Sequence, residues 1–505
     1  MLAGCGEDEQ QPDEPAAVET RAHGGSAAPA DGDRPNLIVI MTDDQTLESF
    51  GARAMPFTWR LFQGENASVF QQALAVPPLC CPARAGFLTG QYPHNHGVFG
   101  NAPGYPALAD KKNTLPAWLD RAGYHTAFIG KYLNSYESVG GMEPAPGWDS
   151  WHATVRYPSY FDYQINDNGQ LSDYGSSSRD YSTHQLTERA LEEIDPERRD
   201  GPLFLWLAHN APHLVASETR PCAGEVPQPP SAGAFREFEH QPLPQDPSFG
   251  EDDRSDKPRP IEKRPRLDNE DRELLTLRWR CGLAALRAVD ESTERIVEAL
   301  EDAGELEDTV LVFVSDNGYF FGQHAIDKDK RLPYRAAAHV PMAIRVPARL
   351  GGDEAPKEIR ELVSTIDLAP TLLDFAGAGP CRGGHNCRAV DGRSLLPLLD
   401  GEGGYPADRA ILLELNDAYR YEALRTDRYL YSRLYQDRQG LLPTPAVELY
   451  DLEADPWELD NLWHTDRAAA RPILRDLAPR LEALLACRGS EERRFPRVKA
   501  PGDCE

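Results

Sequence analysis

The chain has 505 residues, of which 40% are hydrophobic and 27% are charged, a composition typical of a globular protein with room for one large domain and a smaller one. It carries 53 Lys and Arg residues against 81 Asp and Glu, a formal net charge of −28. This charge argues against a nucleic-acid partner and against a long polyanionic substrate. Because no run of 18 or more apolar residues occurs, we expect no transmembrane helix.

The first 33 residues are rich in Glu, Asp, Gln, Pro, Ala and Gly and lack apolar periodicity, which predicts a disordered tail or tether. Near its start, Leu2-Ala3-Gly4-Cys5 matches the lipobox of bacterial lipoproteins, whose cysteine is lipidated after signal cleavage. No charged or apolar leader precedes this match, so we expect the natural start to lie upstream. The match predicts an extracytoplasmic protein, either secreted or anchored by a lipid at Cys5.

Two apolar runs of the chain end in short polar side chains. The segment 36–42 reads as a strand buried on both faces and runs into Asp43-Asp44, and the segment 310–315 runs into Asp316-Asn317. Ligands bind at the carboxyl ends of the strands of α/β sheets. Oxygen ligands suit a hard cation, so we expect Ca²⁺, with Mg²⁺ as the other candidate. The alternative is that the acidic pair caps a helix.

Strands and helices alternate up to about residue 375, with further strands expected at 125–129 and 203–208 and helices at 55–63, 115–122 and 271–303. This order predicts an α/β sandwich with a large, mostly parallel sheet. Beyond residue 387 short strands at 410–415, 423–425 and 429–432 precede a final helix at 471–485. We therefore expect a large α/β domain over 34–378 and a smaller α+β subdomain with an antiparallel sheet over 379–505.

The chain is organised around the segment Cys80-Cys81-Pro82-Ala83-Arg84-Ala85-Gly86-Phe87-Leu88-Thr89-Gly90. Pro82 fits the first turn of a helix, where its missing N–H costs nothing. Cys80 would then lie at the positive end of the helix, and Arg84 would reach the same place from one turn further on. This arrangement predicts an oxyanion site. The alternative is a buried cysteine pair beside an ordinary helix.

The stretch from 220 to 268 is rich in Pro and in charge and reads as a surface insertion near the site. Within it, six basic residues between Arg254 and Arg266 favour a solvated loop, with a local basic patch as the alternative. Two cysteine pairs, Cys381 with Cys387 and Cys487 with Cys504, are spaced as disulfides of an oxidising compartment. The pairing of the remaining cysteines stays open.

The residues Cys80-Cys81-Pro82-Ala83-Arg84 and Leu88-Thr89-Gly90 closely resemble the signature of the type I sulfatases. The resemblance implies an alkaline-phosphatase-like fold and conversion of Cys80 to formylglycine by a formylglycine-generating enzyme. By the same resemblance, the metal ligands would be Asp43, Asp44, Asp316, Asn317 and the modified Cys80. The cations that bind the sulfate would be Arg84, Lys131 and Lys330. The histidine near the leaving-group oxygen would be His213.

Finer matches at 79–82, 92–96 and 130–136 resemble the N-acetylglucosamine-6-sulfatase branch of this family. Many sulfatases have a histidine where this chain has Leu133, so His94, His96 or Asn134 would take over its role. The run Tyr334-Arg335 through His339 also departs from the family pattern, which implies altered substrate contacts there. The candidate substrate-binding residues are His94, His96, Asn134 and His339.

The resemblance implies a sulfuric ester hydrolase that converts a small sulfated sugar or an aryl sulfate to an alcohol and inorganic sulfate. The alternatives within the superfamily are an arylsulfatase and a phosphodiesterase or phosphonate hydrolase. A third alternative is a non-catalytic, sugar-binding pseudoenzyme. Such a protein would be expected to have lost at least one key residue, yet all are present: Cys80, Arg84, Lys131, Asp316 and Lys330.

Overall fold

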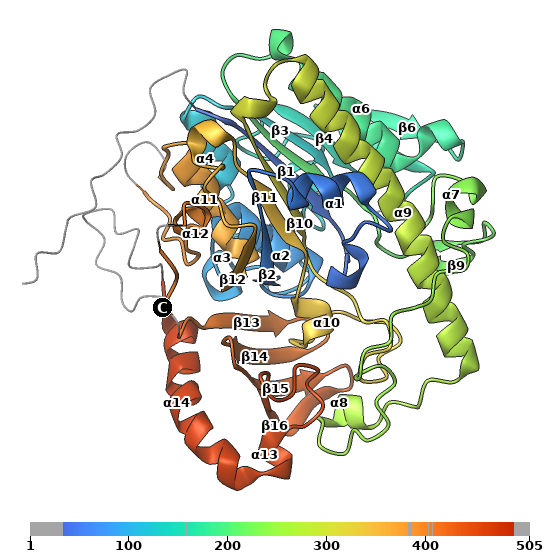
Figure 1. The fold of residues 1–505 in the computed structure, drawn as a ribbon, viewed down its shortest axis with the longest axis vertical. Coiled ribbons are helices and arrows are strands. Elements are labelled where there is room, and N and C mark those ends of the chain that lie inside the picture. The colour runs from blue at the N-terminus through green and yellow to red at the C-terminus, as the bar shows by residue number, and fades with distance from the viewer. Residues whose placement is uncertain (1–33, 157–158, 382–385, 402, 407, 489–505) are drawn as a thin grey trace, which may run out of the picture.

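The computed structural model describes residues 34–488 except 157–158, 382–385, 402 and 407. Most of its strands form one sheet with ten members (Figure 1). In order across the sheet they are β12 (Glu358–Ser364), β2 (Ala67–Leu74), β11 (Met342–Arg345), β10 (Thr309–Ser315), β1 (Asn36–Thr42), β7 (Leu203–Ala208), β3 (His125–Gly130), β4 (Ser150–Thr154), β5 (Tyr163–Asp167) and β6 (Gln170–Tyr174).

The centre of this sheet is parallel. Strand β1 pairs in parallel with β10 on one side and with β7 on the other, and β3 pairs in parallel with β7 and β4. Antiparallel pairs occur where β11 joins β10 and β2, and along the β4–β5–β6 edge. The carboxyl ends of β1, β10, β7 and β3 therefore meet at one border of the sheet, as the sequence predicts.

Both faces of the sheet are covered, because alternate side chains of β1 enter different cores. Leu37, Val39 and Met41 pack in one apolar cluster, and Ile38 and Ile40 pack in the other. On the first face lie α2 (Cys80–Thr89), α4 (Leu115–Arg121), α11 (Leu368–Phe375) and α12 (Leu396–Leu399), and on the second lie α1 (Pro56–Gln63), α6 (Ser182–Ile194) and α9 (Asn269–Asp302) (Figure 1).

A separate sheet of four antiparallel strands lies beside the carboxyl border of the large sheet (Figure 1). Its strands are β13 (Ile411–Asn416), β14 (Arg420–Arg425), β15 (Tyr429–Asp437) and β16 (Gly440–Asp451). The helices α13 (Leu462–Thr465) and α14 (Arg467–Ala486) follow, and their apolar residues share one cluster with the sheet. The predicted antiparallel C-terminal unit is confirmed, whereas the division of the chain at residue 378 stays a prediction.

The shorter helices lie in the connections: α3 (Pro93–His96), α5 (Glu137–Gly140), α7 (Ala232–Arg236), α8 (Arg259–Glu262) and α10 (Arg335–Ala338). Between β7 and α9 the strands β8 (Val215–Ser217) and β9 (Gly224–Val226) form a small sheet of their own. Within the described ranges, none of the helices combines the length and apolarity that crossing a membrane requires.

The predicted Cys381–Cys387 disulfide is present, and a second disulfide joins Cys222 to Cys281. The predicted partner of Cys487, Cys504, lies outside the described residues, as do the tail 1–33 and the proposed anchor Cys5.

The prediction of a solvated basic loop over 254–266 is wrong for two of its residues. Arg254 and Lys257 are 6% and 5% exposed. The guanidinium of Arg254 donates to backbone carbonyls, and the Lys257 ammonium forms ion pairs with Glu251 and Asp256. Burial is tolerated because these partners compensate the lost hydration of the charges.

Candidate active site

The site begins where four neighbouring strands end. Asp43 and Asp44 follow β1, and Asp316 and Asn317 follow β10. On the other side of β1, Lys131 follows β3, and the segment 209–213 follows β7. The backbone N–H of Lys131 donates to the backbone carbonyl of Ala208 at 2.9 Å. The ends of β3 and β7 are therefore hydrogen-bonded to each other.

The helix α2 begins at Cys80, with Pro82 in its first turn as predicted, and ends at Gly90, whose φ of 64° is left-handed. All of its residues are buried. Its preceding residue, Leu79, gives no side-chain cap, and in its first turn the N–H of Cys81 donates to the side chain of Asn101. Cys80 therefore lies at the positive end of the helix dipole.

Arg84 joins the acidic residues of two strands. Its Nε donates to Asp316 Oδ2 at 2.7 Å, its Nη2 lies 3.5 Å from Asp43 Oδ2, and its Nη1 donates to the carbonyl of Lys131. The Lys131 ammonium forms an ion pair with Asp43. The Arg84 and Asp43 side chains are fully buried. The structure thus brings Arg84 and Lys131 to the same carboxylate, that of Asp43.

Lys330 reaches the same point from the loop between β10 and α10. Its ammonium donates to Cys80 Sγ at 2.8 Å and forms an ion pair with Asp44. Cys80 Sγ in turn lies 3.5 Å from Asp43 Oδ1. A cation, a carboxylate and a helix N-terminus thus surround one sulfur atom.

The buried charges shift one another's pKa values. Burial alone would raise the pKa of Asp43, but Lys131, His213, Arg84 and Lys330 hold it well below its usual range. Burial and the neighbouring Asp43 raise the pKa of Asp316 to about 6 and that of the Cys80 thiol to about 11. An unmodified Cys80 therefore stays a thiol at neutral pH, a weak nucleophile.

The acidic residues also fit a metal ion. One oxygen each of Asp43, Asp44 and Asp316 lies within 4.8 Å of the others. Oδ1 of Asn317 is buried without a hydrogen-bond partner, while its Nδ2 donates to Asp44 at 2.6 Å. Asp44 adopts a left-handed φ of 67°, a conformation that is uncommon outside glycine and that clusters at functional sites. Three carboxylates and one free amide oxygen form a donor set suited to a hard divalent cation.

His213 borders the acidic group from the segment after β7. Its Nδ1 lies 2.7 Å from the carbonyl of Leu214, which can only accept, so Nδ1 carries a proton and Nε2 faces the site. Nε2 lies 3.8 Å from Asp44 Oδ2, and the side chain is 25% exposed. This placement leaves one imidazole nitrogen accessible beside the charged centre.

The four candidate substrate-binding residues are not brought to this centre by hydrogen bonds. His94 contacts Glu414 Oε1 at 2.6 Å and the carbonyl of Cys487, His96 Nδ1 accepts from the N–H of Val98, and His339 lies 2.8 Å from the carbonyl of Gln71. Burial lowers the pKa of both His96 and His339 to about 3. Asn134 keeps a buried Oδ1 without a partner.

Sequence reasoning missed a connection between the first turn of α2 and the C-terminal sheet. The N–H of Cys81 donates to Asn101 Oδ1 at 3.1 Å, the N–H of Asn101 donates to Asp417 Oδ2 at 3.0 Å, and Arg331 Nε donates to Asp417 Oδ1 at 3.0 Å. These residues come from four separate stretches, so no local pattern signals them. The connection fixes Arg331, and with it the adjacent Lys330.

Comparison with known proteins gives the family. A model of the sulfatase family matches residues 35–378, and a model of the C-terminal region of N-sulphoglucosamine sulphohydrolase matches residues 322–486. An N-acetylglucosamine-6-sulfatase of Capra hircus is 31% identical over 95% of this chain and 88% of its own length. An extracellular sulfatase homologue of Drosophila melanogaster is 32% identical over 72% of this chain but only 31% of its own length.

A solved structure with 25% identity covers 89% of this chain and 97% of its own, with a TM-score of 0.66. That protein was solved in complex with its substrate, D-glucosamine-2-N,6-O-disulfate. The family match spans well over half of the chain and includes Cys80, Arg84, Lys131 and Lys330. The chain therefore belongs to the sulfatase family and is a sulfuric ester hydrolase.

Proposed function

We propose that this sulfatase removes the 6-O-sulfate group from a glucosamine-type sugar, using formylglycine formed from Cys80 and a bound Ca²⁺. The sugar specificity is supported by the similarity to N-acetylglucosamine-6-sulfatase and to the structure solved with a glucosamine disulfate. The chemistry is supported above all by one observation, the 2.8 Å contact between the Lys330 ammonium and Cys80 Sγ.

The position of Cys80 favours a modified side chain over a cysteine nucleophile. With a thiol pKa of about 11, the unmodified residue would carry little thiolate at neutral pH. Formylglycine at Cys80, once hydrated, would supply two hydroxyl groups, one to attack sulfur and one to release the sulfate. Lys330 and Asp43, which both contact the sulfur atom, would then hold those hydroxyl groups and move their protons.

The remaining cations would bind the sulfate group. Arg84 and Lys131 are fixed through Asp43 and Asp316, so they are pre-organised to balance the negative charge that builds up on the sulfate oxygens during transfer. The proton for the departing alcohol oxygen would come from the Lys330 ammonium, or from His213 Nε2 once that imidazole has taken up a second proton. Both groups border Asp44. Water completes the reaction, which yields the alcohol and inorganic sulfate.

The metal would be held by Asp43, Asp44, Asp316 and Asn317, together with the modified Cys80. In the structure the charges of three carboxylates and of Arg84, Lys131 and Lys330 cancel. A divalent cation would make the centre positive and so suited to an anionic sulfate ester.

An extracytoplasmic location belongs to the same proposal. It is supported by the two disulfides, by the extracellular relative from Drosophila melanogaster and by the lipobox match at Cys5, which lies outside the described residues. Maturation would require a formylglycine-generating enzyme in the producing cell.

The test is a substrate comparison with protein produced together with a formylglycine-generating enzyme. Sulfate release is measured from N-acetylglucosamine 6-sulfate, from its 3-sulfate isomer and from an aryl sulfate, and alcohol release from an aryl phosphodiester. We expect kcat/KM to be highest for the 6-sulfate. Preference for the phosphodiester would contradict the proposal that the reaction is sulfate ester hydrolysis. Equal rates on the two sugar isomers would contradict the proposed specificity for the 6-O-sulfate.

A further inference from the structure

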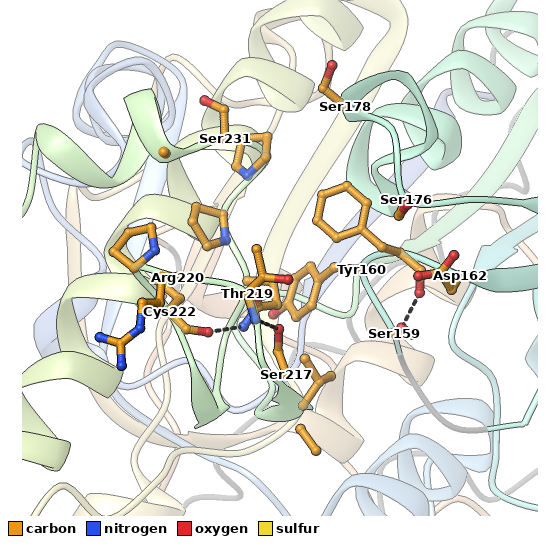
Figure 2. A pocket seen from close by; sticks show the side chains of 18 residues that line it. Ser159, Tyr160, Asp162, Ser176, Ser178, Ser217, Thr219, Arg220, Cys222 and Ser231 are labelled. Carbon is orange, nitrogen blue, oxygen red and sulfur yellow. Dashed lines mark hydrogen bonds between the residues drawn. The ribbon is translucent and has the colours of Figure 1, made fainter.

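A small cavity borders one of the candidate metal ligands. Asp44 lines it, together with the hydroxyl side chains of Thr46 and Ser49. A larger cleft between the segments 159–162, 215–222 and 228–232 differs in this respect, because none of the candidate metal ligands lines it (Figure 2). The small cavity has a volume of about 20 Å³, and one water molecule needs about 10–15 Å³. It therefore has room for one water beside the metal site.

The rest of the cavity wall is almost entirely apolar. It consists of Pro212, Pro227, Trp279, Gly282, Leu283, Leu286 and Phe321. A buried water makes about two to four hydrogen bonds, and the carboxylate and the two hydroxyl groups can supply that number. A water in the cavity would therefore bridge Asp44 to Thr46 and Ser49.

The hydroxyl group of Thr46 lacks the partner that its position in the chain would normally give it. Thr46 is the N-cap residue of the short 3₁₀ helix η1 (Leu47–Ser49), where a threonine side chain usually accepts a hydrogen bond from a backbone N–H of the first turn. Here the side chain makes no such bond. Its Oγ1 is buried without a hydrogen-bond partner among the described residues. A buried hydroxyl that stays unpaired is costly, and a water in the adjoining cavity removes that cost.

The Asp44 carboxylate has one well-held oxygen and one that a water could hold. Oδ1 accepts from Asn317 Nδ2 at 2.6 Å and forms an ion pair with Lys330. Oδ2 lies 3.8 Å from His213 Nε2, beyond hydrogen-bond distance. The backbone of Asp44 is left-handed, with a φ of 67°, so regular strand geometry does not set the direction of its side chain. A donor at Oδ2 would fix the carboxylate at both oxygens.

Gly282 keeps part of this space open. It lies within the long helix α9, where glycine is less favourable than alanine. An alanine would fit, because a Cβ at this position would lie 3.7 Å from Pro212 Cβ and from Pro227 Cγ, which is ordinary van der Waals contact. A methyl group there would take up room that the glycine leaves for a water.

We propose that Thr46 is a positioning residue of the metal centre, whose hydroxyl acts through one water in this cavity to hold the Asp44 carboxylate in the orientation that binds the divalent cation. The Thr46 hydroxyl donates to the water, and the water donates to Asp44 Oδ2 and to Ser49 Oγ. Groups that support metal ligands in this way change metal affinity by about 10–100-fold when they are removed. The proposal rests on the metal site proposed above and adds a residue to it.

The first test measures calcium affinity by calorimetry, with mature protein that has been freed of metal by a chelator. Thr46→Val removes the hydroxyl at nearly constant volume and should weaken Ca²⁺ binding about tenfold. Thr46→Ser keeps the hydroxyl and should bind Ca²⁺ as the unmutated protein does. Thr183→Val is the matched control and should leave the affinity unchanged, because Thr183 is equally buried but lies in α6 and does not line the cavity.

The outcomes of this titration separate the inference from the proposed function. Equal affinities of Thr46→Val and the unmutated protein would overturn the role of Thr46 and leave the metal site standing. Equal losses in Thr46→Val and Thr46→Ser, or in Thr46→Val and Thr183→Val, would overturn it as well. Failure of the unmutated mature protein to bind either Ca²⁺ or Mg²⁺ would overturn the metal of the proposed function, and this inference with it.

Denaturant unfolding distinguishes the positioning role from an ordinary helix cap. If the Thr46 hydroxyl served to cap η1, Thr46→Val would lower the free energy of unfolding equally with and without calcium. We expect the loss to grow by about 1.4 kcal/mol when calcium is saturating, which is the equivalent of a tenfold weaker affinity. A loss that does not depend on calcium would contradict the proposal.

Gly282→Ala removes the water without changing a polar group. The added methyl group takes its place, while alanine favours the helix. We expect calcium affinity to fall about tenfold although the calcium-free protein becomes no less stable. The Thr46→Val, Gly282→Ala double variant should bind calcium as each single variant does, because both changes remove the same water. Unchanged affinity in Gly282→Ala, or losses that add in the double variant, would overturn the proposal.

A high-resolution crystal structure of the calcium-bound protein tests the water itself. We expect one ordered water within about 3 Å of both Thr46 Oγ1 and the Asp44 carboxylate. A cavity without that water, or a Thr46 hydroxyl that accepts from the N–H of Ser49 instead, would overturn the proposal.

Discussion

The Lys330 ammonium lies 2.8 Å from Cys80 Sγ, although 250 positions separate the two residues in the chain. Lys330 is placed by a loop whose next residue, Arg331, is tied to the C-terminal sheet through Asp417. Cys80 is placed by the first turn of α2. The contact therefore depends on the correct packing of the small sheet against the large one.

Replacing Lys330 with Met should lower kcat by about 10²–10³-fold, because one pre-organised cation at the reacting atoms is lost. Steady-state hydrolysis of an aryl sulfate measures the change, and mass spectrometry shows whether Cys80 is still converted. Lys328→Met is the matched control, since Lys328 is 42% exposed and pairs only with Glu225 among the described residues. Equal losses in the two variants would contradict a role for Lys330 in the reaction.

Replacing Cys80 with Ser should stop turnover after at most one sulfate transfer, because an ordinary alcohol lacks the second hydroxyl needed for release. We expect a steady-state rate below about one thousandth of that of the mature enzyme. Cys81→Ala, at the adjacent buried thiol, is expected to keep turnover. Sustained hydrolysis by purified Cys80→Ser protein would be incompatible with this mechanism.

Replacing Asn317 with Ala should weaken Ca²⁺ binding at least about 10-fold, because the buried amide oxygen at the acidic group is removed. Calcium at about 100 times its dissociation constant should stabilise the unmutated protein by about 2.7 kcal/mol. Thermal unfolding across a calcium titration, after treatment with a chelator, measures both effects. Asn416→Ala, at an exposed residue at the end of β13, serves as the control and should leave the titration unchanged.

Stability should also depend on pH through a cluster remote from the site. Glu193 contacts His125 at 2.9 Å and His152 at 3.4 Å. Burial opposes the charged form of Glu193, but the hydrogen bonds from both histidines lower its pKa to about 2. The hydrogen bond that His125 donates to Glu193 raises the pKa of His125. Burial opposes the charged form of His152, but its hydrogen bonds to Asp167 and Glu193 overcome burial and raise its pKa.

The sign of the dependence follows from these directions. The lowered pKa of Glu193 stabilises the folded state above pH 4.5, near its unfolded pKa, and this stabilisation is lost as the pH falls toward 2. The raised pKa values of the histidines stabilise the folded state below pH 6.5, and this stabilisation is lost at higher pH. Glu193→Gln should therefore destabilise the protein most between pH 5 and 6, by about 2 kcal/mol, and less at pH 3.5 and pH 8. Denaturant unfolding at these pH values measures the effect, with Glu192→Gln as the exposed control. A loss that is equal at all pH values would contradict this account.

The sequence predicts the centre of the fold better than its edges. The runs at β1 and β10 are apolar throughout because they are buried on both faces, so they stand out as strands and their polar ends stand out as ligands. Strand β6, Gln170–Tyr174, is mostly exposed and polar, and it is a strand because β5 pairs with it. Its conformation comes from a partner that local sequence does not reveal.

The same distinction applies to the site. The positions of Asp43, Asp316 and Lys131 follow from the rule that parallel strands end at one border, and Cys80 and Arg84 follow from helix geometry. The roles of His94 and His339 stay predictions, and their hydrogen bonds lie elsewhere because Glu414 and the carbonyl of Gln71 are nearer partners. Such partners depend on three-dimensional packing, which a motif does not encode.

The most direct test is the mass of the proteolytic peptide that contains Cys80, taken from protein produced together with a formylglycine-generating enzyme. The account predicts a peptide about 18 Da lighter than the cysteine form, because a thiol is exchanged for an aldehyde. An unmodified Cys80 in protein that nevertheless hydrolyses sulfate esters would contradict the central claim, and the roles given to Lys330 and Asp43 at the modified residue would fall with it.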